Sequence, residues 1–211
     1  MGMKIVTGRT GAAHVTSADD GARNAGIIGT GKYIFNIGNK FAYEIISNNL
    51  IRVKDGYGIN QGRQFGIEHA DYEECEIDNG LQGVKRTDLI VAKYKRDSLT
   101  GLESVTIAVI KGTSGDNYTD PEYVEGNILN GDDEDDFLLY RVKINGLAIE
   151  KVETMFNTLL DVKSIYDKLV VVNNLAAAAV PNSKITQSSA VTASGYVLDA
   201  REKNASISGT L

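Results

Sequence analysis

The stretch from residue 84 to residue 112 reads VKRTDLIVAKYKRDSLTGLESVTIAVIKG and decides the fold. Two runs rich in apolar and β-branched residues are joined by the polar segment 95–101, which predicts a long β-hairpin. Each run is apolar at successive positions, LIVA at 89–92 and IAVI at 107–110, so both faces of the sheet should be covered here. We therefore place this hairpin at the centre of the core.

Short alternating segments surround the hairpin. Tyr33, Phe35 and Ile37, for example, share one face of such a segment. The chain has 22 glycines and only 2 prolines among its 211 residues. Strands separated by turn signals about 8–12 residues apart are typical of sandwiches and barrels. The sequence therefore predicts a mainly β domain over residues 1–149, either an antiparallel β-sandwich or barrel-like.

The pattern changes after residue 149, because glycine disappears and apolar residues recur at alternating spacings of three and four. The resulting heptad seam consists of Val152, Met155, Leu159, Val162, Tyr166, Leu169 and Asn173. It predicts a long C-terminal α-helix over residues 150–180, a coiled-coil neck whose seam is the oligomer interface and whose register Asn173 fixes. Pro181 ends the helix, and residues 181–211 are expected to be extended.

An amphipathic helix that packs back against its own β-domain is the alternative. A helix of about 30 residues is roughly 45 Å long at 1.5 Å per residue. A compact domain of this size offers no surface of that length, so we expect the helix to leave the domain and pair with copies of itself.

Composition and charge exclude several classes of function. The net charge is −6 and basic residues form no stripe, which disfavours nucleic-acid binding. No run of 18 apolar residues and no signal-peptide pattern occurs, so we expect a protein made in the cytoplasm without membrane insertion. Cys75, the single cysteine, is flanked by glutamates that should raise its thiol pKa, and we expect it to be inert.

Motifs for catalysis, metals and cofactors are weak. His14 and His69 are far apart and have no cysteine nearby, and the acidic run 132–136 lacks the spacing of a calcium loop and should be a solvated loop. The sequence GIIGTG at 26–31 is not followed by a predicted helix, so it does not predict a phosphate cradle. We therefore predict no catalytic, metal or cofactor site and no enzymatic activity.

A carbohydrate-binding module that contacts cell-surface saccharide is an alternative function. Such sites use exposed aromatic rings. Tyr57, Tyr118 and Tyr123 lie in or near predicted loops and are the candidate saccharide contacts, although the chain has no tryptophan.

Several motifs carry a resemblance to a known family. They are HVTSADDG at 14–21, NAG at 24–26, QGR at 61–63, NGLQGVKRTDLIVAKY at 79–94 and TGLES at 100–104. Together they resemble tail and baseplate structural proteins of siphophages and prophages of Gram-positive bacteria. SGYVLDARE at 194–202, with GTL at 209–211, is similar to a motif near the ends of phage tail-fibre proteins.

The resemblance implies a virion structural protein of the tail tip or baseplate. Its β-domain would dock onto other tail or baseplate proteins, and its helical neck would form a symmetric homo-oligomer. Phage fibres are commonly trimers, so a homotrimer is expected. The protein would be located in the virion tail and contribute to host attachment, through saccharide on the host cell surface in the alternative given above.

Overall fold

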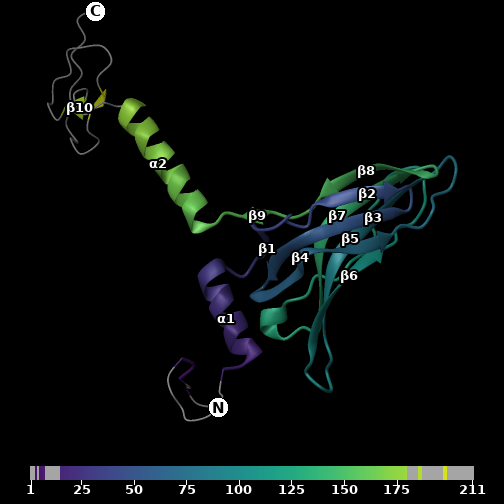
Figure 1. The fold of residues 1–211 in the computed structure, drawn as a ribbon, viewed down its shortest axis with the longest axis horizontal. Coiled ribbons are helices and arrows are strands. Elements are labelled where there is room, and N and C mark those ends of the chain that lie inside the picture. The colour runs from purple at the N-terminus through teal and green to yellow at the C-terminus, as the bar shows by residue number, and fades with distance from the viewer. Residues whose placement is uncertain (1–2, 4, 8–14, 180–184, 187–196, 199–211) are drawn as a thin grey trace, which may run out of the picture. The chain divides into compact units, whose positions relative to one another are not determined.

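A computed structural model describes residues 3, 5–7, 15–179, 185–186 and 197–198 (Figure 1). The chain divides into two compact units, one that ends at Leu159 and one that begins at Leu160. The first unit is mainly β and contains two sheets that share one hydrophobic core. The second contains the helix α2.

Sheet A is built around the long strand β3. It consists of β1 (Lys32–Phe35), β2 (Tyr43–Ser47), β3 (Leu50–Asn60), β4 (Arg63–Glu76) and β9 (Thr158–Leu159). β4 is antiparallel to β3 on one side, while β1 and β2 pair with different halves of β3 on the other side. β9 adds to β1 in the parallel direction.

Sheet B has the order β6-β5-β7-β8, and all of its pairs are antiparallel. Its strands are β5 (Lys85–Arg96), β6 (Glu103–Ile110), β7 (Glu134–Asn145) and β8 (Ala148–Thr154). The predicted hairpin is therefore present as β5 and β6. Residues 89–92 of β5 are buried on both faces, as their sequence predicts, but β6 lies at the edge and residues 107–110 are only half-buried.

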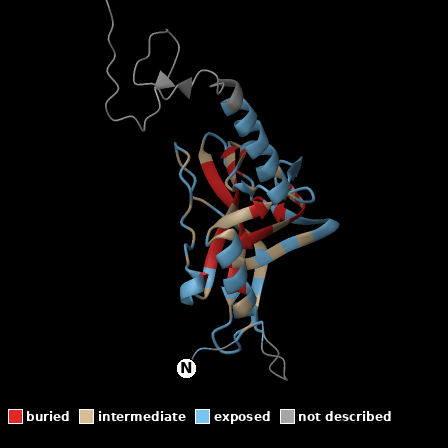
Figure 2. Cartoon of the chain, turned by 90° about the vertical axis from the view of Figure 1, so that its left-hand side faces the viewer, coloured by how far each residue is buried: buried red, intermediate tan, exposed pale blue. Residues whose placement is uncertain are grey.

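The core lies between the two sheets (Figure 2). Sheet A contributes Ile34, Ile51 and Val53, and sheet B contributes Phe137 and Leu139, among others. Burial of an aliphatic or aromatic side chain stabilises a fold by about 1.5–3 kcal/mol. A core of this size therefore holds the two sheets together without a disulfide or a metal.

The outer face of sheet B is closed by a covering segment, residues 112–133. This segment includes a turn of 3₁₀ helix, η1 (Ile128–Asn130), and Gly115 pairs with Lys85. It approaches the strands so closely that a Cβ at Gly112 would lie 2.0 Å from the carbonyl oxygen of Thr87, and one at Gly126 would lie 2.0 Å from that of Glu134. This cover explains why β5 is buried on both faces.

Helix α1 (Ser17–Ile28) is an element that the sequence reading missed. Thr16 caps it, and Thr16 and Asp19 form a reciprocal capping box. The backbone carbonyl of Gly21 lies 2.2 Å from where a Cβ on Gly62 would be, so only glycine fits at this contact between the helix and the β3–β4 turn. The sequence GIIGTG at 26–31 lies at the end of this helix, where no helix amides point outward to hold a phosphate.

The prediction of a long helix over residues 150–180 is wrong. Residues 148–154 form β8 and residues 158–159 form β9, so the helix α2 begins only at Val162 and ends at Ala179. Its 18 residues make it about 27 Å long. The error has a physical reason: apolar residues three and four apart in 152–159 suit these two strands and their connection as well as they suit a helix. The predicted extended segment 181–211 lies outside the described residues, apart from the short paired strands β10 (Ile185–Thr186) and β11 (Val197–Leu198).

Glu153 provides a test of the position of β8 beside β7. Its carboxylate accepts charge-assisted contacts from Lys151, Lys143 and Arg141, and these hold its pKa at about 2, below the usual value of 4.5. Because the folded pKa is depressed, the stability that this group contributes is fully present above pH 4.5 and is lost as the pH falls towards 2. We expect Glu153→Gln to lower the melting temperature at pH 7, with the difference from the original chain shrinking as the pH falls below 4.

Thermal unfolding followed by circular dichroism between pH 2 and pH 7 measures this difference. Glu122→Gln, at an exposed position of the covering segment, is the matched control. A Glu153→Gln effect that is as large at pH 2 as at pH 7 contradicts the assignment.

Candidate functional site

Helix α2 is the most exposed apolar element in the described part of the chain. Asp161, just before the helix, caps its start: the backbone amide of Ser164 donates to Asp161 Oδ1 at 2.7 Å, and the Ser164 hydroxyl donates to Oδ2 at 2.9 Å. Lys163 and Asp167 form an ion pair one turn apart on the polar face. The hydrogen bonds to Asp161 therefore define where α2 starts.

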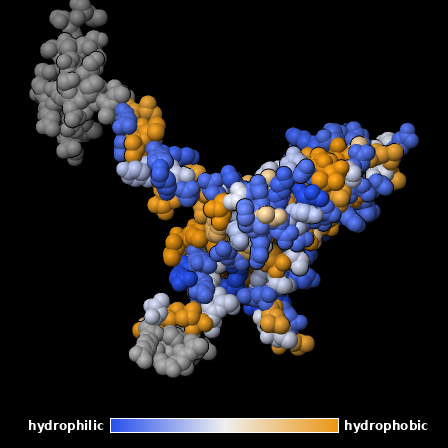
Figure 3. Space-filling model, viewed as in Figure 1, coloured by the Kyte–Doolittle hydropathy of each residue, from blue (hydrophilic) through white to orange (hydrophobic). Residues whose placement is uncertain are grey.

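The apolar side chains of α2 are uncovered (Figure 3). Val162 is 83% exposed, Tyr166 is 62% exposed and Leu169 is 55% exposed. Further exposed apolar residues of the helix are Ile165, Val170, Val171, Val172 and Leu175. A helix that is apolar over most of its circumference is normally buried. The exposed apolar surface of α2 is therefore the feature of this helix that an account of function has to explain.

The predicted oligomer seam falls into two parts. Val152 is only 8% exposed in β8 and belongs to the core. Met155 is half-buried and donates its backbone N–H to the carbonyl oxygen of Leu139, and Leu159 is half-buried in β9 opposite Phe35. These three residues serve the sandwich and cannot line a helical seam.

The other four members, Val162, Tyr166, Leu169 and Asn173, lie on α2 and are exposed. They share one side of the helix with Ile165, Val172 and Ala176, because residues three, four and seven apart lie on the same face. The structure therefore shortens the predicted interface to this stripe.

The three candidate tyrosines lie in different surroundings. Tyr57 is a half-buried residue of β3 whose ring lies over Gly66, and so it is not in a loop. Tyr118 donates to Glu150 at 2.7 Å, and Lys85 and Lys143 lie 5.3 and 5.5 Å from its ring centre. Burial and the Glu150 carboxylate raise the pKa of Tyr118 to about 12. Its ring is thus already engaged by neighbours.

Tyr123 differs from the other two because it lines a hollow. Its hydroxyl donates to Glu125 at 2.8 Å. The hollow has a volume of about 360 Å³ and is bordered by Lys32, Phe156 and Asn157 as well. The structure does not bring the three tyrosines together, and Tyr123 is the one placed to contact a ligand.

The acidic run 132–136 is only in part the solvated loop that the sequence suggested. Asp132 and Asp133 precede β7 outside any strand, whereas Asp135 and Asp136 lie near the start of β7 and are buried. Asp135 accepts from Lys32 Nζ at 2.7 and 2.8 Å and from Asn60 Nδ2 at 2.7 Å. Asp136 accepts from the backbone amide of Val124 at 2.9 Å. No local pattern reveals this, because the donors lie on distant parts of the sequence.

A second buried ion pair is structural. Arg86 donates from Nε and a terminal nitrogen to the two carboxylate oxygens of Asp88, at 2.8 and 2.9 Å. The same guanidinium reaches the backbone carbonyls of Asp78 and Asn79, and Gly112 donates its amide to Asp88. Every group here has a partner within the fold, so the pair anchors loops and offers nothing to a substrate.

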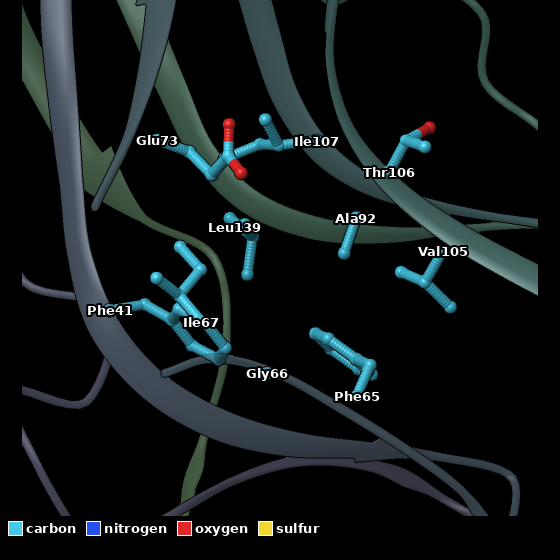
Figure 4. Close-up of a pocket in the computed structure, with 10 residues that line it drawn as sticks. All are labelled: Phe41, Phe65, Gly66, Ile67, Glu73, Ala92, Val105, Thr106, Ile107 and Leu139. Atoms are coloured by element: carbon cyan, nitrogen blue, oxygen red, sulfur yellow. The ribbon is translucent and has the colours of Figure 1, made fainter. Parts of the chain in front are cut away.

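An apolar hollow of about 240 Å³ opens between the edge strands β4 and β6 (Figure 4). Phe41, Phe65, Ile67 and Leu139 surround it, and the carboxylate of Glu73 points in from the side. Glu73 is the only ionisable group among its lining residues, and no second acid, histidine or lysine lies beside it there to form a catalytic or metal-ligating pair. We assign it no chemistry.

The five motifs that carry the family resemblance meet at one corner of the sandwich. Arg63 forms an ion pair with Glu103 at 2.8 Å and donates to the backbone carbonyl of Ser17 at 3.3 Å. Tyr94 donates to the same Glu103 at 2.8 Å, and Asn24 donates to the carbonyl of Gly62. Residues from all five motifs, far apart in the sequence, therefore hold α1, β4 and the β5–β6 hairpin together.

Comparison with protein-family models and with curated proteins finds no match for this chain. In the part of the chain that the structure describes, no three metal-ligating side chains form a cluster. None of the helices within those same residues is long and apolar enough to span a membrane. The surfaces described above are therefore what an account of function can use.

The reactivity of Cys75 tests the expectation that this cysteine is buried and inert. The thiol is buried beside Ile51, and burial, with a smaller contribution from Glu73, raises its pKa to about 12. A rise from 9 to about 12 lowers the thiolate fraction at pH 8 about a thousandfold. We expect Ellman's reagent to react with the native chain at least about a hundredfold more slowly than with the chain in guanidinium, and equal rates would contradict the assignment.

Proposed function

We propose that this chain is a non-enzymatic structural protein of a phage or prophage virion, located at the tail tip or baseplate. In this proposal it assembles as a homo-oligomer through α2, docks onto other tail or baseplate proteins and contributes to host attachment. The observation that carries the proposal is the uncovered apolar stripe of α2, which a second copy of the same helix would cover.

Energetics favour pairing of this helix. An isolated helix of about 18 residues is only marginally stable in water. Burial of the Val162, Ile165, Leu169 and Val172 side chains would contribute roughly 6–12 kcal/mol per helix before the entropy of association is subtracted. Self-association therefore supplies the stabilisation that the helix lacks by itself.

The width of the stripe supports more than two helices. A two-stranded seam uses two positions in every seven. Here Ile165 and Tyr166 are adjacent, and Val172 is adjacent to Asn173, so the stripe is wider than such a seam requires. In a trimer, which the resemblance implies, both residues of each adjacent pair would be covered by other helices. Asn173 is the polar residue that would fix the register of the helices.

The motifs that carry the resemblance belong to one structural unit. They supply both partners of the Arg63–Glu103 ion pair and the Asn24–Gly62 hydrogen bond. In the proposed virion protein, this corner would be part of the β-domain.

Light scattering of the full-length chain tests the assembly. We expect a mass of three times 22.8 kDa for the original chain. Leu169→Asp places a charge in the middle of the stripe and should reduce the mass to that of one chain while the β signal in circular dichroism stays the same. Asn174→Asp introduces the same charge on the opposite side of the helix and should leave the oligomer intact.

Two results would overturn the proposed assembly. One is a mass that shows the original chain to be a monomer. The other is an oligomeric mass that Leu169→Asp leaves unchanged. The virion role has its own test. Mass spectrometry of purified particles from an induced lysogen should detect the chain, and its absence from intact particles contradicts a structural role.

A further inference from the structure

We propose that residues 123–128 of the covering segment, called the ridge below, and the furrow beside it bind a neutral oligosaccharide. The proposal rests on the proposed role in host attachment and assigns it a site. Its central residue is Tyr123, because this ring lines the furrow while Tyr57 and Tyr118 do not.

The ridge is held from below by buried polar side chains. Val124 donates its amide to Asp136 Oδ2 at 2.9 Å, and Gly126 donates its amide to Asp135 Oδ1 at 2.7 Å. Gln61 accepts from the amide of Ile128 at 2.9 Å and donates to the carbonyl of Gly126 at 2.8 Å. The amides of residues 124, 126 and 128 are thus each fixed by a buried side chain, two from β7 and one from the turn between β3 and β4.

Such an arrangement fixes a shape more than it adds stability. Replacing a buried charge network with packed apolar residues is often neutral or stabilising. Here Asp135, Asp136 and Gln61 are buried in order to hold a segment that is neither helix nor strand over most of its length. A segment whose conformation is set before a ligand arrives loses little entropy on binding, which is what a recognition surface requires.

Two hollows adjoin along the ridge. One has a volume of about 360 Å³ and the other about 520 Å³, and both are lined by Lys32 and Gly126, so they adjoin at these two residues and together make up the furrow. The polar and aromatic groups along it are Tyr123, Glu125, Asn127, Asn130, Asn157 and Thr30. An aromatic ring for stacking beside amides and a carboxylate that exchange hydrogen bonds with hydroxyls is the chemistry that recognises a sugar.

The charges of the furrow select a neutral ligand over a phosphate polymer. Lys32 is the cation that lines it, and its ammonium group is already bound to both oxygens of Asp135 and to the carbonyl of Asp136. Glu125 is exposed and adds a negative charge at the rim. An anionic ligand would meet this carboxylate, while the one lining cation, Lys32, is already neutralised by Asp135.

The experiment is saturation-transfer difference NMR on the full-length chain, with maltotriose, cellotriose and chitotriose as neutral probes and inorganic phosphate as the anionic comparison. We expect at least one trisaccharide to bind and phosphate not to compete. Tyr123→Ala should weaken that binding at least tenfold. Tyr118→Ala removes a tyrosine of equal size whose hydroxyl also contacts a glutamate, and it should leave binding unchanged.

Glu125→Ala removes only an exposed side chain, so it keeps the test decisive should Tyr123→Ala fail to fold; we expect it to weaken binding several-fold. The proposed saccharide site is overturned if none of the three trisaccharides binds. It is also overturned if the original chain, Tyr123→Ala and Glu125→Ala all bind equally well. The monomeric Leu169→Asp chain separates the two proposals. A furrow within one chain should bind equally well there, and loss of binding in that variant would place the ligand at the oligomer interface instead.

Discussion

One buried carboxylate holds the two sheets and their cover in position. Asp135 of β7 is 0% exposed, and it accepts from Lys32 of β1, from Asn60 of β3 and from the backbone amide of Gly126. A buried charge without partners is strongly destabilising, so all three donors have to be in place when the core forms. Together with the apolar core, this group therefore ties β1 and β3 of sheet A and the covering segment to β7 of sheet B.

The ion pair between Lys32 of β1 and Asp135 also bears on where helix α2 can begin. With Lys32 held at Asp135, β1 presents a free edge, and the chain that leaves β8 returns to it: Ile34 donates its amide to the carbonyl of Asn157, and β9 pairs with β1. Phe156 packs edge-to-face on Tyr140 on the way. Residues up to Leu159 are therefore used by the sandwich, and only the apolar residues beyond them remain for α2.

Interactions local in sequence were predictable, and those between distant segments were not. The run LIVA at 89–92 predicted a strand covered on both faces, and the burial of these residues confirms it. Helix α1 was also predictable, because Thr16 followed by Asp19 is the pattern of a capping box at a helix start. The burial of Asp135 could not be foreseen, because its partner Lys32 lies 103 residues away. The prediction that Val152 belongs to a helical seam was wrong, because the spacing of apolar residues alone does not distinguish a strand from a helix.

The two proposed surfaces depend on each other for their effect. A shallow furrow lined by one tyrosine, one carboxylate and a few amides gives a weak contact with each sugar, because much of the ligand stays in water. Binding of a second site on the same surface polymer becomes intramolecular once copies are joined, and the gain in avidity can reach about 10²–10⁴ without any new contact. In the two proposals, the apolar stripe of α2 would join the copies, and the ridge above Asp135 would supply the weak contact that avidity multiplies.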